Sequence, residues 1–327
     1  MSDRSPGQGR TPRLIVGIPS AGRAAILGPC LQAMADQTRR PDLVLLSVTG
    51  PADLPPGRSL PFPVRVLVGP RGGAPQRNRI LEALSPDDLL VLLDDDFLMA
   101  PDYLAQVERL FRTHPDIALI TGTVLADGIL GPGYDVATGA RLLRDGLRRP
   151  AGAELIPVHT GYGCNMALRA APVVRQGLRF DEALPLYSWL EDVDFSHRLA
   201  ASGRLVRAEA LRGVHLGTKT GRTPGLLLGY SQIANPLYLR RKGTIGRRHA
   251  ATLLCRALAS NGLRTLRPPP WADYRGRLRG NLLALGDVLR RRDRPGRILT
   301  LAQPDPPAAA PAGPDTAQAV PRATPRA

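Results

Sequence analysis

Leu89-Leu90-Val91-Leu92-Leu93-Asp94-Asp95-Asp96 is the stretch that decides the fold of this 327-residue chain. Five apolar residues without a polar interruption predict a strand that is covered on both faces and therefore lies inside a sheet. The carboxylates follow the strand, at the end where ligands bind in open α/β sheets. Adjacent carboxylates repel one another unless a cation lies among them, and their oxygens suit a hard divalent ion such as Mg²⁺ or Mn²⁺. We expect a metal site here, with a solvated acidic turn as the alternative.

The sequence around this stretch alternates apolar runs with helical patterns, which predicts an α/β fold with a mainly parallel central sheet and flanking helices. We expect strands at residues 14–18, 43–48, 64–68, 117–125, 165–168, 205–208 and 213–216, and helices at residues 23–37, 74–84, 103–111 and 189–201. The Gly-rich stretch 127–157 predicts a long loop with one short helix around 141–147.

The positive charge of the chain is concentrated near its C-terminal end. The formal net charge is +16, and residues 240–297 alone hold sixteen Arg or Lys against three Asp. This stretch lacks the interleaved aromatic residues of nucleic-acid stacking surfaces, so we expect no nucleic-acid partner. An anionic membrane surface fits the mixture of apolar and basic residues, and a solvated basic face on packed helices is the alternative.

Six motifs follow one another in a set order. They are Ile15-Val16-Gly17-Ile18-Pro19-Ser20 with Arg23, then Gln37-Thr38-Arg39-Arg40-Pro41-Asp42, Gly72-Gly73-Ala74-Pro75-Gln76-Arg77-Asn78-Arg79, Leu93-Asp94-Asp95-Asp96 with Pro101-Asp102-Tyr103-Leu104, Gly163-Cys164-Asn165-Met166-Ala167-Leu168-Arg169, and Leu190-Glu191-Asp192-Val193-Asp194-Phe195 with Arg198-Leu199. In this order the chain resembles a family 2 glycosyltransferase with the GT-A fold. The resemblance covers residues 14–215.

The resemblance implies an inverting enzyme that moves a sugar from a nucleotide-diphosphate donor to the hydroxyl of a carbohydrate or lipid-linked acceptor, in polysaccharide or glycolipid assembly. Asp192 would be the general base, and Glu191 would orient the acceptor or the base. The divalent metal, Mn²⁺ or Mg²⁺, would lie on Asp94, Asp96 and His215. The donor would contact Pro19, Ser20, Arg23, Gly72, Arg77, Asp94, Asp95, Lys219 and Arg222, and the acceptor side would include Gly163, Asn165 and Trp189.

Several of these residues have a plainer explanation. Arg77 could be a solvated arginine at a helix start, and the Gly72-Gly73 pair also fits an ordinary tight turn. Glu191 and Asp192 are typical of helix N-terminal capping. A lone histidine such as His215 is more often a satisfied core or surface residue.

The chain departs from the family pattern after its second expected strand. Family members often have Asp-Asp-Gly-Ser there, and the first Asp contacts the base. Here Ser47-Val48-Thr49-Gly50 follows, with no acid before Asp53. The identity of the donor nucleotide therefore stays open, with UDP as the default. The alternatives to a transferase of sugars are a nucleotidyltransferase of similar fold and a basic nucleic-acid- or membrane-binding protein without transferase activity.

We expect four regions in the chain. Residues 1–12 form a disordered N-terminus, and 13–230 form the catalytic domain, with a nucleotide-binding half (13–126) and an acceptor half (127–230). Residues 231–300 form a basic helical extension, and 301–327 form a disordered Pro/Ala-rich tail. The polar start predicts no secretory signal, so we expect a cytoplasmic protein. Peripheral attachment to the inner face of the cytoplasmic membrane remains an alternative.

Overall fold

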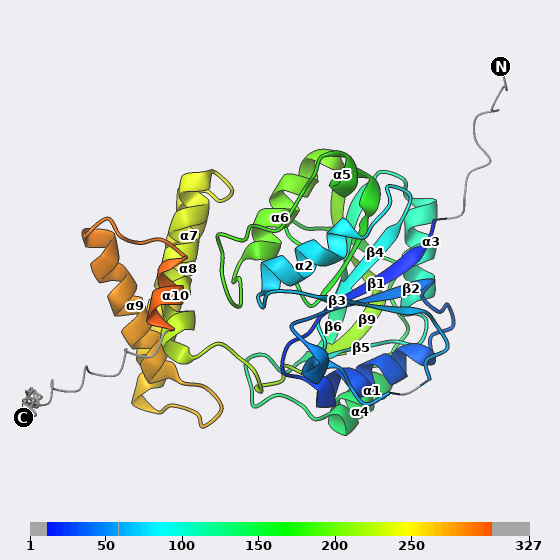
Figure 1. Cartoon of the computed structure of the whole chain (residues 1–327), viewed down its shortest axis with the longest axis horizontal. Coiled ribbons are helices and arrows are strands. Elements are labelled where there is room, and N and C mark those ends of the chain that lie inside the picture. The colour runs from blue at the N-terminus through cyan, green and yellow to red at the C-terminus, as the bar shows by residue number, and fades with distance from the viewer. Residues whose placement is uncertain (1–11, 58, 303–327) are drawn as a thin grey trace, which may run out of the picture.

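The computed structural model describes residues 12–57 and 59–302. A central sheet is flanked by helices, and the C-terminal helices form a bundle beside it (Figure 1). The predicted α/β class with a C-terminal helical extension is confirmed. The two segments expected to be disordered, 1–12 and 301–327, lie outside the described residues except for their inner ends.

The sheet runs in the order β3-β2-β1-β4-β8-β6-β9-β5, and β7 pairs with β9. The strands are β1 (Leu14–Pro19), β2 (Leu43–Val48), β3 (Val64–Val68), β4 (Leu89–Leu93), β5 (Phe97–Met99), β6 (Ile117–Asp127), β7 (Leu155–Pro157), β8 (Asn165–Arg169) and β9 (Arg204–His215). Strands β1 to β4 pair in parallel, whereas β8 is antiparallel to both β4 and β6. In the other half of the sheet, β6 pairs with β9 in parallel, whereas β5 and β7 are antiparallel to β9, so the sheet is mixed.

Helices cover both faces of the sheet, which explains why β4 is apolar throughout. Leu89, Val91 and Leu93 pack toward α1 (Ala24–Ala35) and α3 (Tyr103–Thr113). Leu90 and Leu92 pack toward α2 (Gly73–Glu82), α5 (Ala170–Arg175) and α6 (Glu191–Leu199) on the other face. As predicted, β4 lies inside the sheet, so its carboxyl end opens onto the middle of the molecule.

Two local predictions were wrong. Helix α4 spans Val136–Leu147, longer than the expected short helix, because the side chain of Asp135 caps it by accepting a hydrogen bond from the Thr138 backbone N–H at 2.7 Å. Its Gly139 allows α4 to pack closely against the side chain of Leu216. The two short strands expected at 205–208 and 213–216 are one strand, β9, because register shifts against β6 accommodate the intervening residues.

Four helices form the C-terminal bundle: α7 (Gly225–Lys242), α8 (Arg247–Leu266), α9 (Tyr274–Leu289) and α10 (Arg297–Leu301). The domain boundary expected after residue 230 falls inside α7. Helices α7 and α9 approach each other closely, because Gly229 lies against the backbone of Arg277 and Gly280 against that of Leu226. None of the helices in the described part of the chain combines the length and apolar content that a bilayer crossing needs.

The close approach of α7 and α9 predicts opposite effects for two glycine substitutions. A Cβ at Gly280 would lie 2.1 Å from the Leu226 carbonyl oxygen, whereas a Cβ at Gly262 in α8 would meet nothing within 4 Å. Gly280→Ala should lower the free energy of unfolding by about 1–3 kcal/mol, because two backbones must separate. Gly262→Ala should raise it by up to about 1 kcal/mol through helix propensity. Urea unfolding followed by circular dichroism measures both, and equal effects would contradict the described packing.

Candidate active site

A cleft of about 780 Å³ opens at the carboxyl ends of β1 and β4. Both acidic groups of the sequence line it: Asp94 and Asp95 after β4, and Glu191 and Asp192 at the start of α6. Residues that are almost a hundred positions apart in the chain therefore face one space. The site depends on this arrangement, because acids on opposite sides of the molecule could not act on one ligand.

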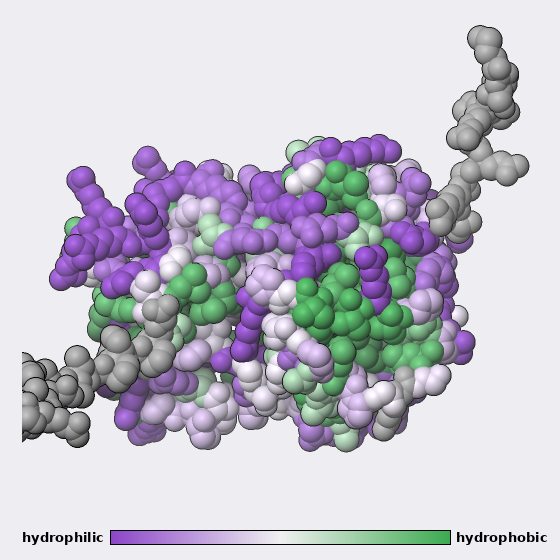
Figure 2. Space-filling model, in the orientation of Figure 1, coloured by the Kyte–Doolittle hydropathy of each residue, from purple (hydrophilic) through white to green (hydrophobic). Residues whose placement is uncertain are grey.

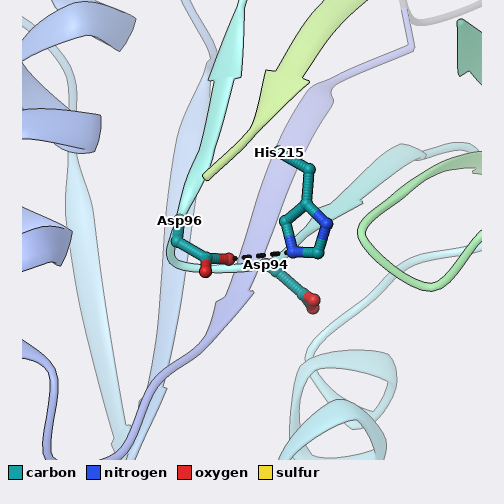
Figure 3. A group of neighbouring side chains, drawn as sticks. All are labelled: Asp94, Asp96 and His215. Atoms are coloured by element: carbon teal, nitrogen blue, oxygen red, sulfur yellow. Dashed lines mark ion pairs between the residues drawn. The ribbon is translucent and has the colours of Figure 1, made fainter. Parts of the chain in front are cut away.

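Asp94, Asp96 and His215 lie close together (Figure 3), and Asp94 and His215 line the cleft. Each offers one ligand atom, and these atoms lie within 4.8 Å of one another. Asp94 and Asp96 lie between β4 and β5, and His215 ends β9, whose pairing with β5 sets His215 opposite Phe97. The strand pairing thus brings a histidine to the acidic stretch from more than a hundred residues away.

The chemistry of this group fits a divalent ion. Asp96 Oδ2 accepts a hydrogen bond from the Thr218 N–H at 2.8 Å, but the buried Oδ1 has no hydrogen-bond partner and lies 3.3 Å from His215 Nε2. His215 Nδ1 contacts Asp127 Oδ1 at 2.9 Å. An outer carboxylate on one ring nitrogen is the usual support of a metal-binding histidine, since it leaves the other nitrogen for the ion.

Without an ion, a proton on the imidazole balances these carboxylates. Burial lowers the pKa of His215, but the neighbouring carboxylates of Asp127 and Asp96 raise it to about 10. The pKa of Asp96 is held well below its ordinary value, because these contacts outweigh burial. A divalent cation would supply the same positive charge in place of that proton.

Asp95 connects the acidic stretch to the turn after β1. Its Oδ2 accepts a hydrogen bond from Ser20 Oγ at 2.6 Å, and its Oδ1 accepts one from Arg23 Nη1 at 2.9 Å. The same turn is held from behind by Asp53, which accepts from the Gly22 N–H at 2.6 Å and from Thr49. Asp53 lies outside the cleft lining, and both of its carboxylate oxygens accept hydrogen bonds.

Arg77 lies between the two acidic groups. Its Nη1 donates to Glu191 Oε1 at 2.6 Å, and its Nη2 donates to Asp94 Oδ1 at 2.9 Å and to the Gly163 carbonyl oxygen at 3.1 Å. Burial alone would lower the pKa of Arg77, but Glu191, Asp94 and Asp192 raise it above its ordinary value. Arg77 is therefore a fixed cation of the site.

The two acids of α6 are held differently. Asp192 accepts hydrogen bonds from the N–H groups of Gly163 at 3.1 Å and Val193 at 2.8 Å, whereas Glu191 pairs with Arg77. Burial raises the pKa of Asp192, and Arg77 and the two N–H groups oppose this shift. Burial also raises the pKa of Glu191, to about 8. Asp192 lines the cleft with a carboxylate that binds protons more readily than an exposed one.

Most of the residues predicted from the sequence line the cleft. They are Pro19, Ser20, Arg23, Gly72, Arg77, Asp94, Asp95, Gly163, Trp189, Glu191, Asp192, His215 and Arg222. Gly72 has a φ of 146°, a backbone conformation that residues with a side chain rarely adopt, which explains why a glycine occupies this position. Three predicted residues are absent from the lining. Asp96 is buried beneath it, Lys219 Nζ donates to the carbonyls of Gly128 and Ile129, and Asn165 is fully buried and joins β8 to Thr121 of β6.

The cleft also contains residues that the sequence reasoning missed. Tyr162 packs edge-on against His215 and donates its hydroxyl to Asp127 Oδ2 at 2.8 Å. Asp127 ends β6, and a carboxylate at a strand end is a signal that was available in the sequence. The C-terminal bundle forms an apolar wall, made of Leu226, Leu227 and Leu301, for which no local sequence signal exists.

Loss of the Arg77 cation should destabilise the protein. Arg77→Met leaves Asp94 without its counter-charge and, above about pH 8, Glu191 as well, at a cost of about 3–5 kcal/mol. The deficit should deepen as the pH rises through about 8, where Glu191 gives up its proton in the folded wild type. Arg71→Met is the control, because Arg71 is exposed and donates only to the Gly221 carbonyl at 3.1 Å. Chemical unfolding at pH 6 and pH 9 tests this, and a pH-independent loss would contradict it.

The fold resembles those of solved glycosyltransferases. The structure of residues 1–349 of S. aureus TarS in complex with UDP-GlcNAc matches at a TM-score of 0.51 with 14% identity, over 88% of this chain and 83% of that chain. GalNAc-T7 with UDP, GalNAc and Mn²⁺ matches at 0.51 with 15% identity, over 82% of this chain and 54% of that chain. The match to the longer TarS structure covers 44% of TarS, so the chain spans less than half of that protein.

No curated protein matches the chain. The family model described as glycosyltransferase-like family 2 matches residues 12–208, which is more than half of the chain and includes both acidic groups of the cleft. The chain therefore belongs to glycosyltransferase-like family 2, and the family expected from the motifs is confirmed.

Proposed function

We propose that this protein transfers a sugar from a nucleotide-diphosphate donor to an acceptor hydroxyl with inversion at the anomeric carbon. The observation that carries the proposal is the shared cleft, in which Asp192 and the Asp94, Asp96 and His215 group are linked through Gly163 and Arg77. A single displacement at the anomeric carbon requires a base and a diphosphate site that face the same cavity.

The donor would lie over the turn after β1. Arg23 and Arg222 line this side of the cleft and supply positive charge for phosphate oxygens. UDP remains the first nucleotide to test, because the TarS and GalNAc-T7 structures hold UDP-GlcNAc and UDP. The divalent ion, Mn²⁺ or Mg²⁺, would be held by Asp94, Asp96 and His215, where it would offset the charge that develops on the diphosphate.

The acceptor would approach from the side of α6. Asp192 takes the proton from the acceptor hydroxyl, and the oxygen forms a bond to the anomeric carbon while the bond from that carbon to the diphosphate breaks. The diphosphate leaves with the bonding electron pair. Glu191, paired with Arg77, keeps Asp192 free for this step, since the guanidinium is occupied by Glu191 and Asp94. Such a base contributes about 10²–10⁴-fold to the rate.

Two conservative variants separate the base from the metal site. Asp192→Asn should lower kcat by about 10²–10⁴-fold, because the amide cannot take the proton. It should leave the thermal shift produced by UDP with Mn²⁺ within the error of wild type. Asp96→Asn should abolish that shift, because it removes a charged ligand atom. Turnover assays and melting curves of both variants measure these effects, and an Asp192→Asn protein with full turnover would refute the base.

The competing nucleotidyltransferase function predicts a different substrate. A panel of nucleotide sugars and free nucleoside triphosphates, each with an acceptor mixture, distinguishes the two by whether nucleoside diphosphate or pyrophosphate is released. We expect nucleoside diphosphate from a nucleotide sugar. Release of pyrophosphate from a triphosphate would replace the proposal with its competitor.

We also infer that the C-terminal bundle attaches to an anionic lipid surface. In Figure 2, hydrophilic residues cover much of the bundle, with hydrophobic patches between them, and the charges of the bundle are nearly all positive. On α8, Leu263 and Leu266 are exposed, and Arg256 lies on the face of Leu263 by helical spacing. The exposed Arg267 follows the last residue of the helix directly. Exposed leucines flanked by arginines are typical of helices that lie in a membrane interface.

Removal of charge near these leucines should weaken vesicle binding. Each Arg near an anionic surface contributes about 1 kcal/mol, so Arg256→Gln with Arg267→Gln should reduce binding to phosphatidylserine vesicles by about tenfold or more. Arg65→Gln with Arg112→Gln is the matched control, because both arginines are exposed on the α/β part. Vesicle co-sedimentation measures the effect, and equal binding by both double variants would refute the attachment.

A further inference from the structure

The turn that precedes α6 is held in an unusual backbone conformation. Leu186, Ser188 and Leu190 have φ values of 58°, 55° and 75°, in the left-handed region that non-glycine residues seldom occupy. Each such residue costs about 1–3 kcal/mol and persists only where its surroundings hold it. Leu190 is the residue directly before Glu191, and its side chain gives α6 no capping hydrogen bond. Asp192 therefore lies at the start of a helix whose preceding turn must be stabilised by contacts with other parts of the chain.

The C-terminal helices supply part of that support through apolar packing. Leu184 and Leu190 of the turn share one buried cluster with Leu239 of α7 and with Ile245 and Ala250. The Asn235 side chain of α7 donates a hydrogen bond to the Trp189 carbonyl oxygen at 2.9 Å. The turn thus lies between the catalytic sheet and the bundle.

A polar anchor joins the bundle to α6 itself. Asp194, two residues after Asp192, is completely buried. Its Oδ1 accepts a hydrogen bond from Thr244 Oγ1 at 2.7 Å, and Lys242 Nζ lies 2.9 Å from the same carboxylate. Lys242 is the last residue of α7. Arg198, one turn along α6, also pairs with Asp194 at 2.7 Å.

We propose that Lys242 and Thr244 are positioning residues that hold Asp192 in place through Asp194. The proposal rests on the assignment of Asp192 as the base. Helix α6 has nine residues, and Asp192 and Asp194 both lie in its first turn. A shift of Asp194 therefore moves Asp192 relative to the Gly163 N–H that holds its carboxylate. The basic extension would then serve catalysis by fixing the geometry of a residue that it does not touch.

Neighbouring arginine and lysine side chains at the end of α7 provide a matched pair of variants. Lys242→Met removes a cation that lies 2.9 Å from Asp194 of α6 and 2.6 Å from Asp181, which precedes the strained turn. Arg241→Met removes one that contacts only Asp293 within the bundle, with Nη1 2.6 Å from Asp293 Oδ2 and Nη2 2.9 Å from the Asp293 carbonyl oxygen. Both variants delete a positive charge from the same end of α7, so they differ mainly in which carboxylates lose their contact with the cation.

Lys242→Met should lower kcat by about 10–100-fold, because a small misplacement of a reacting group costs about this much. The KM for the nucleotide sugar should stay within about twofold, since the donor side of the cleft is untouched. Lys242→Arg should restore most of kcat. Arg241→Met should leave kcat within about twofold of wild type. A Lys242→Met protein with wild-type kcat, or equal losses in both methionine variants, would overturn the proposal.

Hydrogen exchange provides a second readout that does not depend on turnover. Amides of residues 184–199 should exchange faster in Lys242→Met than in Arg241→Met, with the sheet unchanged in both. Unchanged exchange in this segment would overturn the positioning role even if no sugar acceptor were found. If wild type shows no turnover or Asp192→Asn retains it, the proposed function fails, and the exchange experiment still decides whether the anchor holds α6.

Discussion

The crowding of carboxylates in one cleft is the constraint on which the rest of the site depends. Asp94, Glu191 and Asp192 meet around the single buried guanidinium of Arg77, while Asp96 lies beside His215. Like charges at this spacing repel strongly in a partly dry environment, so the fold must supply cations from elements far apart in the chain. Arg77 comes from α2 and His215 from β9. The proposed divalent ion would offset the negative charge that remains beside His215.

The sheet explains why these groups can meet at all. Strands β1 and β4 pair in parallel, so their carboxyl ends open onto the same edge, and antiparallel β8 begins where β4 ends. Gly163, just before β8, can therefore contact Arg77 through its carbonyl and Asp192 through its N–H. A Cβ at this position would lie 3.3 Å from Asp192 Oδ2, which leaves little room for any other residue. The pairing of the strands thus sets the backbone positions from which the residues of the site act.

Sequence reasoning predicted the parts of this structure that have a local cause. The bounds expected for β2, β3 and β4 agree with the structure, because each is a short apolar run between turn residues. Helix α4 was underestimated, since Gly139 and Gly146 weaken a helical pattern although close packing requires the former. The partners of Arg77 and the wall that includes Leu301 have no local signal, because they arise from contacts between distant segments. The roles of Asp192, Glu191 and the donor-side residues remain predictions.

The cleft has two walls that are encoded in separate stretches of the chain. The charged wall comes from the sheet and α6, whereas Leu226, Leu227 and Leu301 come from the bundle. A change in the bundle can therefore reshape one side of the cavity without altering the residues around the acidic groups. The helical part could be exchanged between relatives only with its contacts to Trp189 and Asp194 preserved. Chimeras that exchange the bundle between relatives would test new acceptors while the acidic groups of the cleft stay the same, provided that Lys242 and Thr244 are kept.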